Sequence, residues 1–112
     1  MAECLFCRIV RREIPAQIVH EDDEALVFKD VNPQAPTHVL VVPKKHIGAL
    51  SATTDADVEL LGRLQRTACR VASEAGLSSF RLVTNDGREA GQSVAHLHYH
   101  LLGGRPMSWP PG

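Results

Sequence analysis

The chain has 112 residues, of which 44% are hydrophobic and 22% charged, and its formal net charge is −1. This length fits one compact domain, residues 1–112, and the composition excludes a disordered, collagen-like or coiled-coil chain. The nearly neutral charge argues against a broad electrostatic surface for nucleic acid. Because the longest apolar run, Val39–Val42, is too short to span a bilayer, no membrane partner is expected either.

The N-terminus and the cysteines bear on location. Met1–Cys4 lacks the basic and then apolar pattern of a secretory signal. Three cysteines, an odd number, argue against a disulfide framework and favour a reducing compartment. We therefore expect a cytoplasmic protein. A domain this small buries only about two thirds of its unfolded surface, so we also expect a dimer.

The first half of the chain predicts one short helix and three strands. Cys4–Arg12 is expected to be helical, and a strand is expected to start at Ile18–His20. Ala25–Lys29 is a second strand candidate, and the two prolines within Asp30–Pro36 predict a loop. Thr37–Val42, which is rich in β-branched residues, predicts a third strand.

A long helix follows. Thr54 and Asp57 form a capping box at its start, and Gly76 is a stop signal at its end. Between them, apolar residues recur at the three- and four-residue steps that place them on one helical face. These residues are Val58, Leu61, Leu64, Ala68, Val71 and Ala75.

The last part of the chain predicts two more strands. They are expected at Phe80–Thr84 and His96–Leu102, separated by a polar, glycine-containing loop over Asn85–Ser93. Five strands and one long helix, without regular strand–helix alternation, predict an α+β fold with an antiparallel sheet.

Three histidines alternate along the predicted fifth strand. The period of two places His96, His98 and His100 on one face and the apolar residues between them on the other. Three adjacent imidazoles are costly to protonate together, so at least one is expected to stay neutral near pH 7, as a nucleophile or metal ligand requires. The pattern favours nucleophilic chemistry. A polar, solvent-facing strand and a purely metal-binding triad remain alternatives.

The loop before the histidines supports chemistry on an anion. Gly91 lets backbone N–H groups approach a phosphate closely, and the Ser93 hydroxyl can donate to a phosphate oxygen or a leaving group. Neither a Walker phosphate loop nor a Rossmann glycine fingerprint is present in the sequence.

Taken together, several segments carry a resemblance to a known family. His96–Leu102 matches the pattern His-x-His-x-His followed by two apolar residues. The other matching segments are Arg12–Ala16, Pro33–His38, Val42–Ile47, Gly91–Val94, Gly103–Arg105 and the tail Trp109–Gly112. The sequence thus resembles the histidine triad (HIT) superfamily over nearly its whole length, and within it the Hint branch of histidine triad nucleotide-binding proteins.

The resemblance implies a fold and an activity. The fold is a five-stranded antiparallel sheet with one long and one short helix, and a two-fold dimer joins two sheets into ten strands. The activity is that of a purine nucleoside phosphoramidase, which hydrolyses the P–N bond of adenosine or guanosine 5′-monophosphoramidates to AMP or GMP and an amine. His98 would form a covalent nucleotidyl intermediate, with no cofactor required for catalysis.

The resemblance also assigns the site residues. The catalytic group is His96, His98, His100, Ser93 and His38. The nucleotide-binding group is Phe6, Ile9, Ile14, Phe28, Asp30, Val31, Asn85, Gly91, Gln92, Ser93, Val94, His98, His100 and Trp109. In it, Asp30 accepts the ribose hydroxyls and the hydrophobic residues line a purine pocket, although several of them could equally be ordinary core. Trp109 would reach the partner's site through a C-terminal tail that crosses the dimer interface, or else be an exposed tail residue.

A zinc site is a further possibility. Cys4 and Cys7 share one face of the predicted first helix, and Phe6 and Ile9 point roughly the other way. Two cysteines cannot complete a zinc site. By resemblance to zinc-binding relatives, His46 and His96 would complete it with a structural Zn²⁺. The alternative is a pair of reduced, partly buried cysteines.

Three other functions stay open. One is a purine-nucleotide-binding regulator whose turnover is incidental and which acts through a protein partner. Another is a dinucleoside polyphosphate hydrolase, the activity of the Fhit branch. The third is a zinc-stabilised scaffold.

Overall fold

The computed structural model describes residues 4–112; residues 1–3, which belong to the segment considered above for a leader, lie outside the described residues. The helices are α1 (Leu5–Val10) and α2 (Val58–Glu74). The strands are β1 (Ile18–Glu21), β2 (Ala25–Lys29), β3 (Thr37–Pro43), β4 (Phe80–Val83) and β5 (Tyr99–Gly103). Short 3₁₀ helices lie at Leu50–Ala52, Asp55–Asp57 and Arg88–Ala90. No helix within residues 4–112 is long and apolar enough to cross a membrane.

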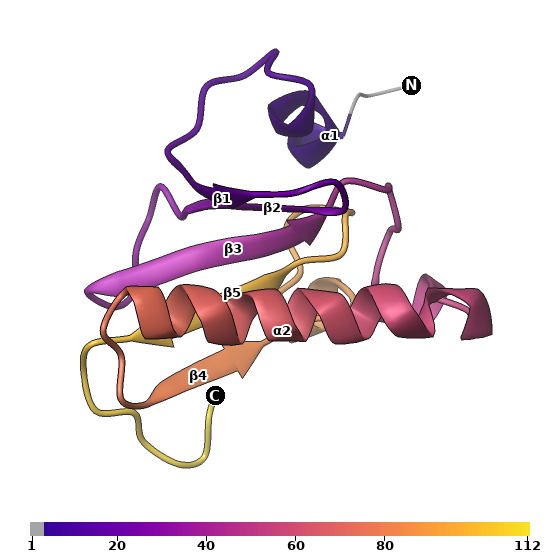
Figure 1. Ribbon diagram of the computed structural model, residues 1–112. Helices are drawn as coiled ribbons and strands as arrows, with labels where there is room; N and C mark the ends of the chain where they lie inside the picture. Colours follow the sequence, from indigo (N-terminus) through magenta and orange to yellow (C-terminus); the bar gives the residue numbers. More distant parts are fainter. Residues whose placement is uncertain (1–3) are drawn as a thin grey trace.

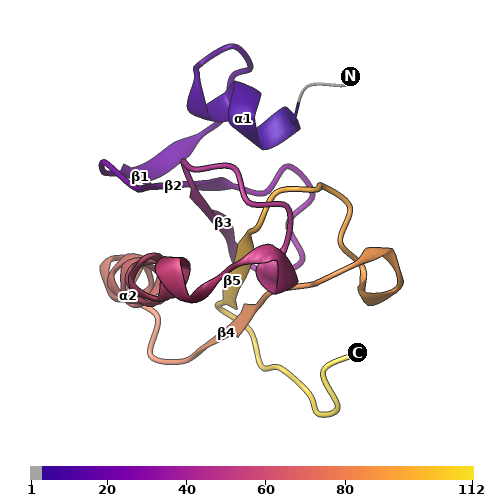
Figure 2. The ribbon, with the colours of Figure 1, turned by 90° about the vertical axis from the view of Figure 1, so that its right-hand side faces the viewer.

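The five strands form one antiparallel sheet in the order β1-β2-β3-β5-β4. The long helix α2 lies across one face of this sheet. The short helix α1 lies on the side of β1 and β2 that points away from α2 (Figures 1 and 2). The central pair is β3 and β5, in which His38 is opposite Leu102 and Leu40 is opposite His100. His38 and His100 are therefore diagonal neighbours on one face of the sheet.

The sheet separates two hydrophobic clusters. Alternation along β3 sends Val39 and Val41 to the cluster that contains α2, and Leu40 and Val42 to the cluster that contains Phe6 and Ile9 of α1. Along the last strand, Leu97, Tyr99 and Leu101 join the α2 cluster. The histidines between them consequently face the α1 side, where the second cluster ends.

The sequence predicted the order and type of these elements; the bounds of α1, β3 and β4 differ from the prediction by one or two residues, and two further differences are larger. The fifth strand begins at Tyr99 rather than His96, because the groups before it bond elsewhere: the Pro43 carbonyl at the end of β3 accepts from His96 Nε2 at 2.8 Å. The Leu97 amide instead donates to the Ile47 carbonyl at 2.6 Å. The capping box of Thr54 forms as expected, but it caps the 3₁₀ turn Asp55–Asp57 that leads into α2.

The α2 cluster generates a stability prediction. Leu64 is fully buried on α2, so Leu64→Ala should lower the free energy of unfolding by about 2–5 kcal/mol through lost burial and a residual cavity. Val58 was predicted on the same buried face but is 63% exposed, because it stands at the first turn of α2, beyond the edge of the core. Val58→Ala is therefore the matched control and should change the free energy of unfolding by less than about 0.5 kcal/mol. Urea titration of both variants measures the difference. Equal losses would contradict the assignment of this face to the core.

Candidate active site

Five of the six histidines lie in one row on the α1 side of the sheet. His38 Nε2 is 2.9 Å from His100 Nδ1, and the rings of His100 and His98 are 5.0 Å apart between centroids. The Phe6 ring lies edge-on against both His98 and His96, at 5.1 and 5.9 Å. His46 ends the row, 4.9 Å from His96. The predicted triad face therefore exists, although only His100 lies within the paired strand.

The hydrogen bonds around His98 decide which of its nitrogens can react. His98 is buried, and its Nδ1 lies 2.7 Å from the carbonyl oxygen of His96. A carbonyl oxygen only accepts, so we assign the ring proton to Nδ1 from this network. When the ring is neutral, its lone pair is then on Nε2, for which residues 4–112 supply no hydrogen-bond partner. This is the arrangement that a nucleophilic imidazole needs.

Hydrogen bonds also decide which nitrogens of His38 and His100 carry the ring protons. The Gln34 backbone N–H donates to His38 Nδ1 at 2.9 Å, so the proton of neutral His38 is on Nε2. That proton points at His100 Nδ1, 2.9 Å away, and the Asp30 carboxylate lies 3.4 Å from His38 Nε2. His100 therefore accepts at Nδ1 and carries its own proton on Nε2. The row thus presents a lone pair on His98 next to a donor on His100.

Burial favours the neutral form of two of these rings, His96 and His100. Desolvation is the largest cause lowering the pKa of His100, and the neighbouring His98 and His38 lower it further, against a smaller opposing effect of Asp30. Desolvation also lowers the pKa of His96, partly opposed by its hydrogen bond to the Pro43 carbonyl. The expectation that at least one imidazole stays neutral near pH 7 has a physical cause here in burial and in repulsion between like charges.

The loop between β4 and β5 is fastened by Gln92. The Gln92 side chain accepts from the Gly87 amide at 2.8 Å, and it donates to the carbonyls of Gly48 and Val94 at 2.8 and 3.0 Å. The prediction placed Gln92 among the nucleotide ligands, and in the structure its carboxamide binds three backbone groups. Ser93 is exposed on the same loop.

Glycine is required at the turn of this loop. Gly91 has φ +98°, a backbone region that favours glycine. A Cβ atom there would lie 3.4 Å from the Asn85 side-chain amide nitrogen. The close approach brings two predicted phosphate ligands, Gly91 and Asn85, side by side.

The predicted hydrophobic lining separates into two groups. Phe6, Ile9 and Phe28 bury all but 4–7% of their surface, and they pack together in the cluster under α1. Ile14 is half-buried at the edge of that cluster, and Val31 is fully exposed. Phe6, Ile9 and Phe28 are thus part of the hydrophobic core, and Ile14 and Val31 leave more of their side-chain surface accessible to a ligand. Trp109, in the C-terminal tail, is 83% exposed.

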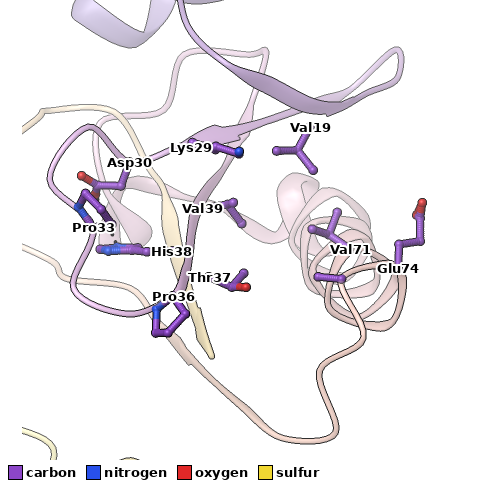
Figure 3. A pocket seen from close by; sticks show the side chains of 11 residues that line it. Val19, Lys29, Asp30, Pro33, Pro36, Thr37, His38, Val39, Val71 and Glu74 are labelled. Atoms are coloured by element: carbon purple, nitrogen blue, oxygen red, sulfur yellow. Dashed lines mark ion pairs between the residues drawn. The ribbon is translucent and has the colours of Figure 1, made fainter. Parts of the chain in front are cut away.

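A groove of about 370 Å³ lies beside β3 and the C-terminal part of α2. Figure 3 shows Asp30, Pro33 and His38 at one end of it, and Val71 and Glu74 of α2 at the other. Of the predicted site residues, only Asp30 and His38 reach this groove. Sequence reasoning did not find its other lining residues, because the helix and the strand ends meet only in the folded chain.

Four donor atoms of the predicted zinc ligands gather at the start of α1. The Sγ atoms and Nδ1 atoms of Cys4, Cys7, His46 and His96 all lie within 4.8 Å of one another. Individual separations are 3.3 Å for Cys4–His96, 3.2 Å for Cys7–His46 and 3.1 Å for His46–His96. Tetrahedral zinc with thiolate and imidazole ligands separates its donor atoms by about 3.3–3.8 Å. The donor set therefore fits zinc.

The orientation of His96 supports the same fit. Its Nε2 lies 2.8 Å from the Pro43 carbonyl and so carries the ring proton, which leaves the Nδ1 lone pair toward the two thiols. Asp30, His38 and His100 also lie within 4.8 Å of one another. They do not fit a metal in the same way, because the Gln34 amide occupies His38 Nδ1 and the other nitrogen holds a proton.

Comparison with known proteins places this geometry in a family. The HIT domain model matches residues 11–107. The chain belongs to the HIT family. An uncharacterized HIT-like protein of Synechocystis sp. is 60% identical over the full length of both chains.

Solved structures of this family superpose closely on the chain. A HIT family hydrolase from Legionella pneumophila is 51% identical, with a TM-score of 0.97 over 98% of this chain and 100% of the other. A HIT family hydrolase from Clostridium thermocellum is 43% identical, with a TM-score of 0.92 over 96% of each chain. The five-stranded antiparallel sheet and the long helix are thus those of the HIT fold.

The lowered pKa of His100 generates a pH prediction. The folded-state pKa lies below the unfolded value of about 6.5. The contribution of His100 to the free energy of unfolding should therefore be constant above that pH and should decrease as the pH falls below it. His100→Asn removes this contribution, so its free energy of unfolding should fall less than that of the wild type between pH 7.5 and pH 5, measured by urea titration. His20→Asn, at a surface pair with Asp22, is the control. Parallel curves for wild type and His100→Asn would refute the prediction.

Proposed function

We propose that this protein is a purine nucleoside phosphoramidase of the Hint type. It would hydrolyse the P–N bond of adenosine or guanosine 5′-monophosphoramidates to AMP or GMP and an amine. The proposal rests on one observation above all: His98 is held with its Nε2 lone pair available, beside a His100 ring whose Nε2 carries a proton. The hydrolase names of the Legionella and Clostridium structures support the reaction class.

In the first step, His98 Nε2 attacks the α-phosphorus and an N–P bond forms. The P–N bond to the amine breaks, and the departing nitrogen keeps the electron pair and takes up a proton from the solvent, a transfer that we assign to relay through the exposed Ser93 hydroxyl. The ring becomes a cation, and its Nδ1–H strengthens the hydrogen bond to the His96 carbonyl. The covalent intermediate splits one difficult displacement into two easier ones.

In the second step, water attacks the same phosphorus, gives up a proton to the solvent and releases the nucleoside monophosphate. The N–P bond breaks, and its electron pair returns to His98 Nε2. No cofactor takes part in either step. The His96 carbonyl keeps the Nδ1 proton in place throughout, so the ring does not need to turn between steps.

The remaining residues bind and orient the nucleotide. His100 Nε2–H, the Gly91 region and the Asn85 amide would donate to the phosphate oxygens. Asp30 would accept the ribose hydroxyls; its Oδ1 is already positioned by the Asn32 amide at 2.8 Å. Ile14 and Val31 would contact the purine.

A homodimer would complete the site. β4 is an edge strand, and Phe80 at its start is 41% exposed. Pairing of two β4 edges about a two-fold axis would produce a ten-stranded sheet and cover both edges. The exposed Trp109 would then reach the partner's leaving-group pocket.

We further propose that Cys4, Cys7, His46 and His96 hold a structural Zn²⁺. The metal would supply a cross-link between α1, the segment after β3 and the approach to β5. Thiolate ligands of this kind stay intact in a reducing compartment, which agrees with the proposed cytoplasmic location.

The nucleophile assignment has a direct test. His98→Asn should lower kcat on an adenosine 5′-phosphoramidate with a reporting amine by about 10³-fold or more, while AMP binding by calorimetry persists. His20→Asn is the control and should retain wild-type turnover. Wild-type protein that binds AMP without turnover would favour the nucleotide-binding regulator, and faster cleavage of a diadenosine polyphosphate would favour the Fhit-type activity.

The zinc proposal has a separate test. Cys7→Ser should lose about one equivalent of zinc, measured by atomic spectroscopy, and its melting temperature should fall by about 5 °C or more. Cys69→Ser, at an exposed cysteine of α2, is the matched control and should keep both zinc and stability. Purified wild type without zinc, whose melting temperature is unchanged by added zinc or a chelator, would contradict the proposal.

A further inference from the structure

The proton arrangement of His38 and His100 depends on one peptide group of a loop. The Gln34 amide, in the loop between β2 and β3, donates to His38 Nδ1 at 2.9 Å. If this N–H were turned away, either nitrogen of His38 could hold the proton, and His100 would lose its fixed donor position. Any contact that fixes the orientation of the Gln34 peptide therefore also fixes which nitrogens of His38 and His100 carry protons.

The same peptide is held from its other side by the start of the C-terminal tail. Arg105 Nε donates to the Gln34 carbonyl oxygen at 2.9 Å. Its Nη1 donates to the Pro106 carbonyl at 3.0 Å, which fixes the guanidinium against its own tail. The planar fork of arginine makes both bonds at once.

A second feature brings the tail against the loop. Gly104 has φ +93°, and a Cβ atom there would lie 2.9 Å from Cβ of Pro36. Glycine is thus required both for the backbone conformation and for the close approach. Pro33 and Pro36, on either side of Gln34 and drawn in Figure 3, restrict the loop further.

We propose that Arg105 is a positioning residue that, through the Gln34 peptide, fixes the protons of His38 and His100 so that His100 Nε2–H faces the substrate. The connection runs from Arg105 to the Gln34 carbonyl, from the Gln34 N–H to His38 Nδ1, and from His38 Nε2–H to His100 Nδ1. No proton is transferred along it; each bond selects the tautomer of the next ring. The catalytic consequence rests on the proposed phosphoramidase function, whereas the tautomers do not.

The test compares two arginines that anchor the same tail. Arg105→Met removes the bond to Gln34, and Arg81→Met removes a bond of 2.8 Å to the Ser108 carbonyl, which touches neither the loop nor the histidines. Long-range proton–nitrogen NMR spectra of isotope-labelled histidine rings report each tautomer directly. Wild type and Arg81→Met should show single Nε2–H forms of His38 and His100, and Arg105→Met should show a mixture of tautomers at both rings.

Turnover of the adenosine phosphoramidate supplies the second measurement. Arg105→Met should lower kcat by about tenfold and leave KM within about twofold, and Arg81→Met should change neither. Gly104→Ala disturbs the same contact by another route and should reproduce the Arg105→Met spectrum if it folds. Unchanged tautomers in Arg105→Met would overturn the proposal, as would mixed tautomers with wild-type kcat. Absence of turnover in the wild type would instead refute the phosphoramidase proposal. The NMR spectra would then still test whether Arg105 fixes the tautomers of His38 and His100.

Discussion

The site depends on one buried hydrogen bond, in which His98 Nδ1 donates to the carbonyl of His96 at 2.7 Å. The bond is possible because the chain leaves the paired strand before Tyr99, so the His96 carbonyl is not needed by the ladder between β3 and β5. Burial makes the alternative, an unpaired polar group, expensive. The lone pair of His98 is consequently held on the nitrogen away from the backbone, where chemistry can use it.

The row of histidines has two ends with different tasks. At one end, His96 turns its Nδ1 to two thiols and its Nε2 to the Pro43 carbonyl. At the other, His38 and His100 are joined to each other and to Asp30. Phe6 lies between the cysteines in sequence and packs on His96 and His98 in space. Short α1 thus connects the donor cluster to the ring that we assign as nucleophile.

Prediction from the sequence succeeded where a feature depends on local periodicity. The bounds of β2 were predicted residue by residue, and the central part of the predicted helix stripe, Leu61 to Val71, packs against the sheet, whereas Val58 and Ala75 at its ends are exposed. It failed where a feature depends on a partner distant in the chain. The start of β5 was placed three residues early because no local pattern shows that the His96 ring bonds to the Pro43 carbonyl and that the Leu97 amide donates to Ile47. Nor does any pattern in the sequence reveal that the Gln92 side chain bonds to Gly48 and Gly87.

The sequence by itself determined the α+β class, the family resemblance, and a face on which three histidines share one side of an extended segment, because a period of two requires no knowledge of the partner strand. Only the tertiary structure decided which nitrogen of each ring carries a proton. That choice belongs to acceptors and donors brought from elsewhere in the chain: the Pro43 carbonyl, the Gln34 amide and, behind it, Arg105. A tautomer is a property of contacts, and these contacts exist only after the loops close.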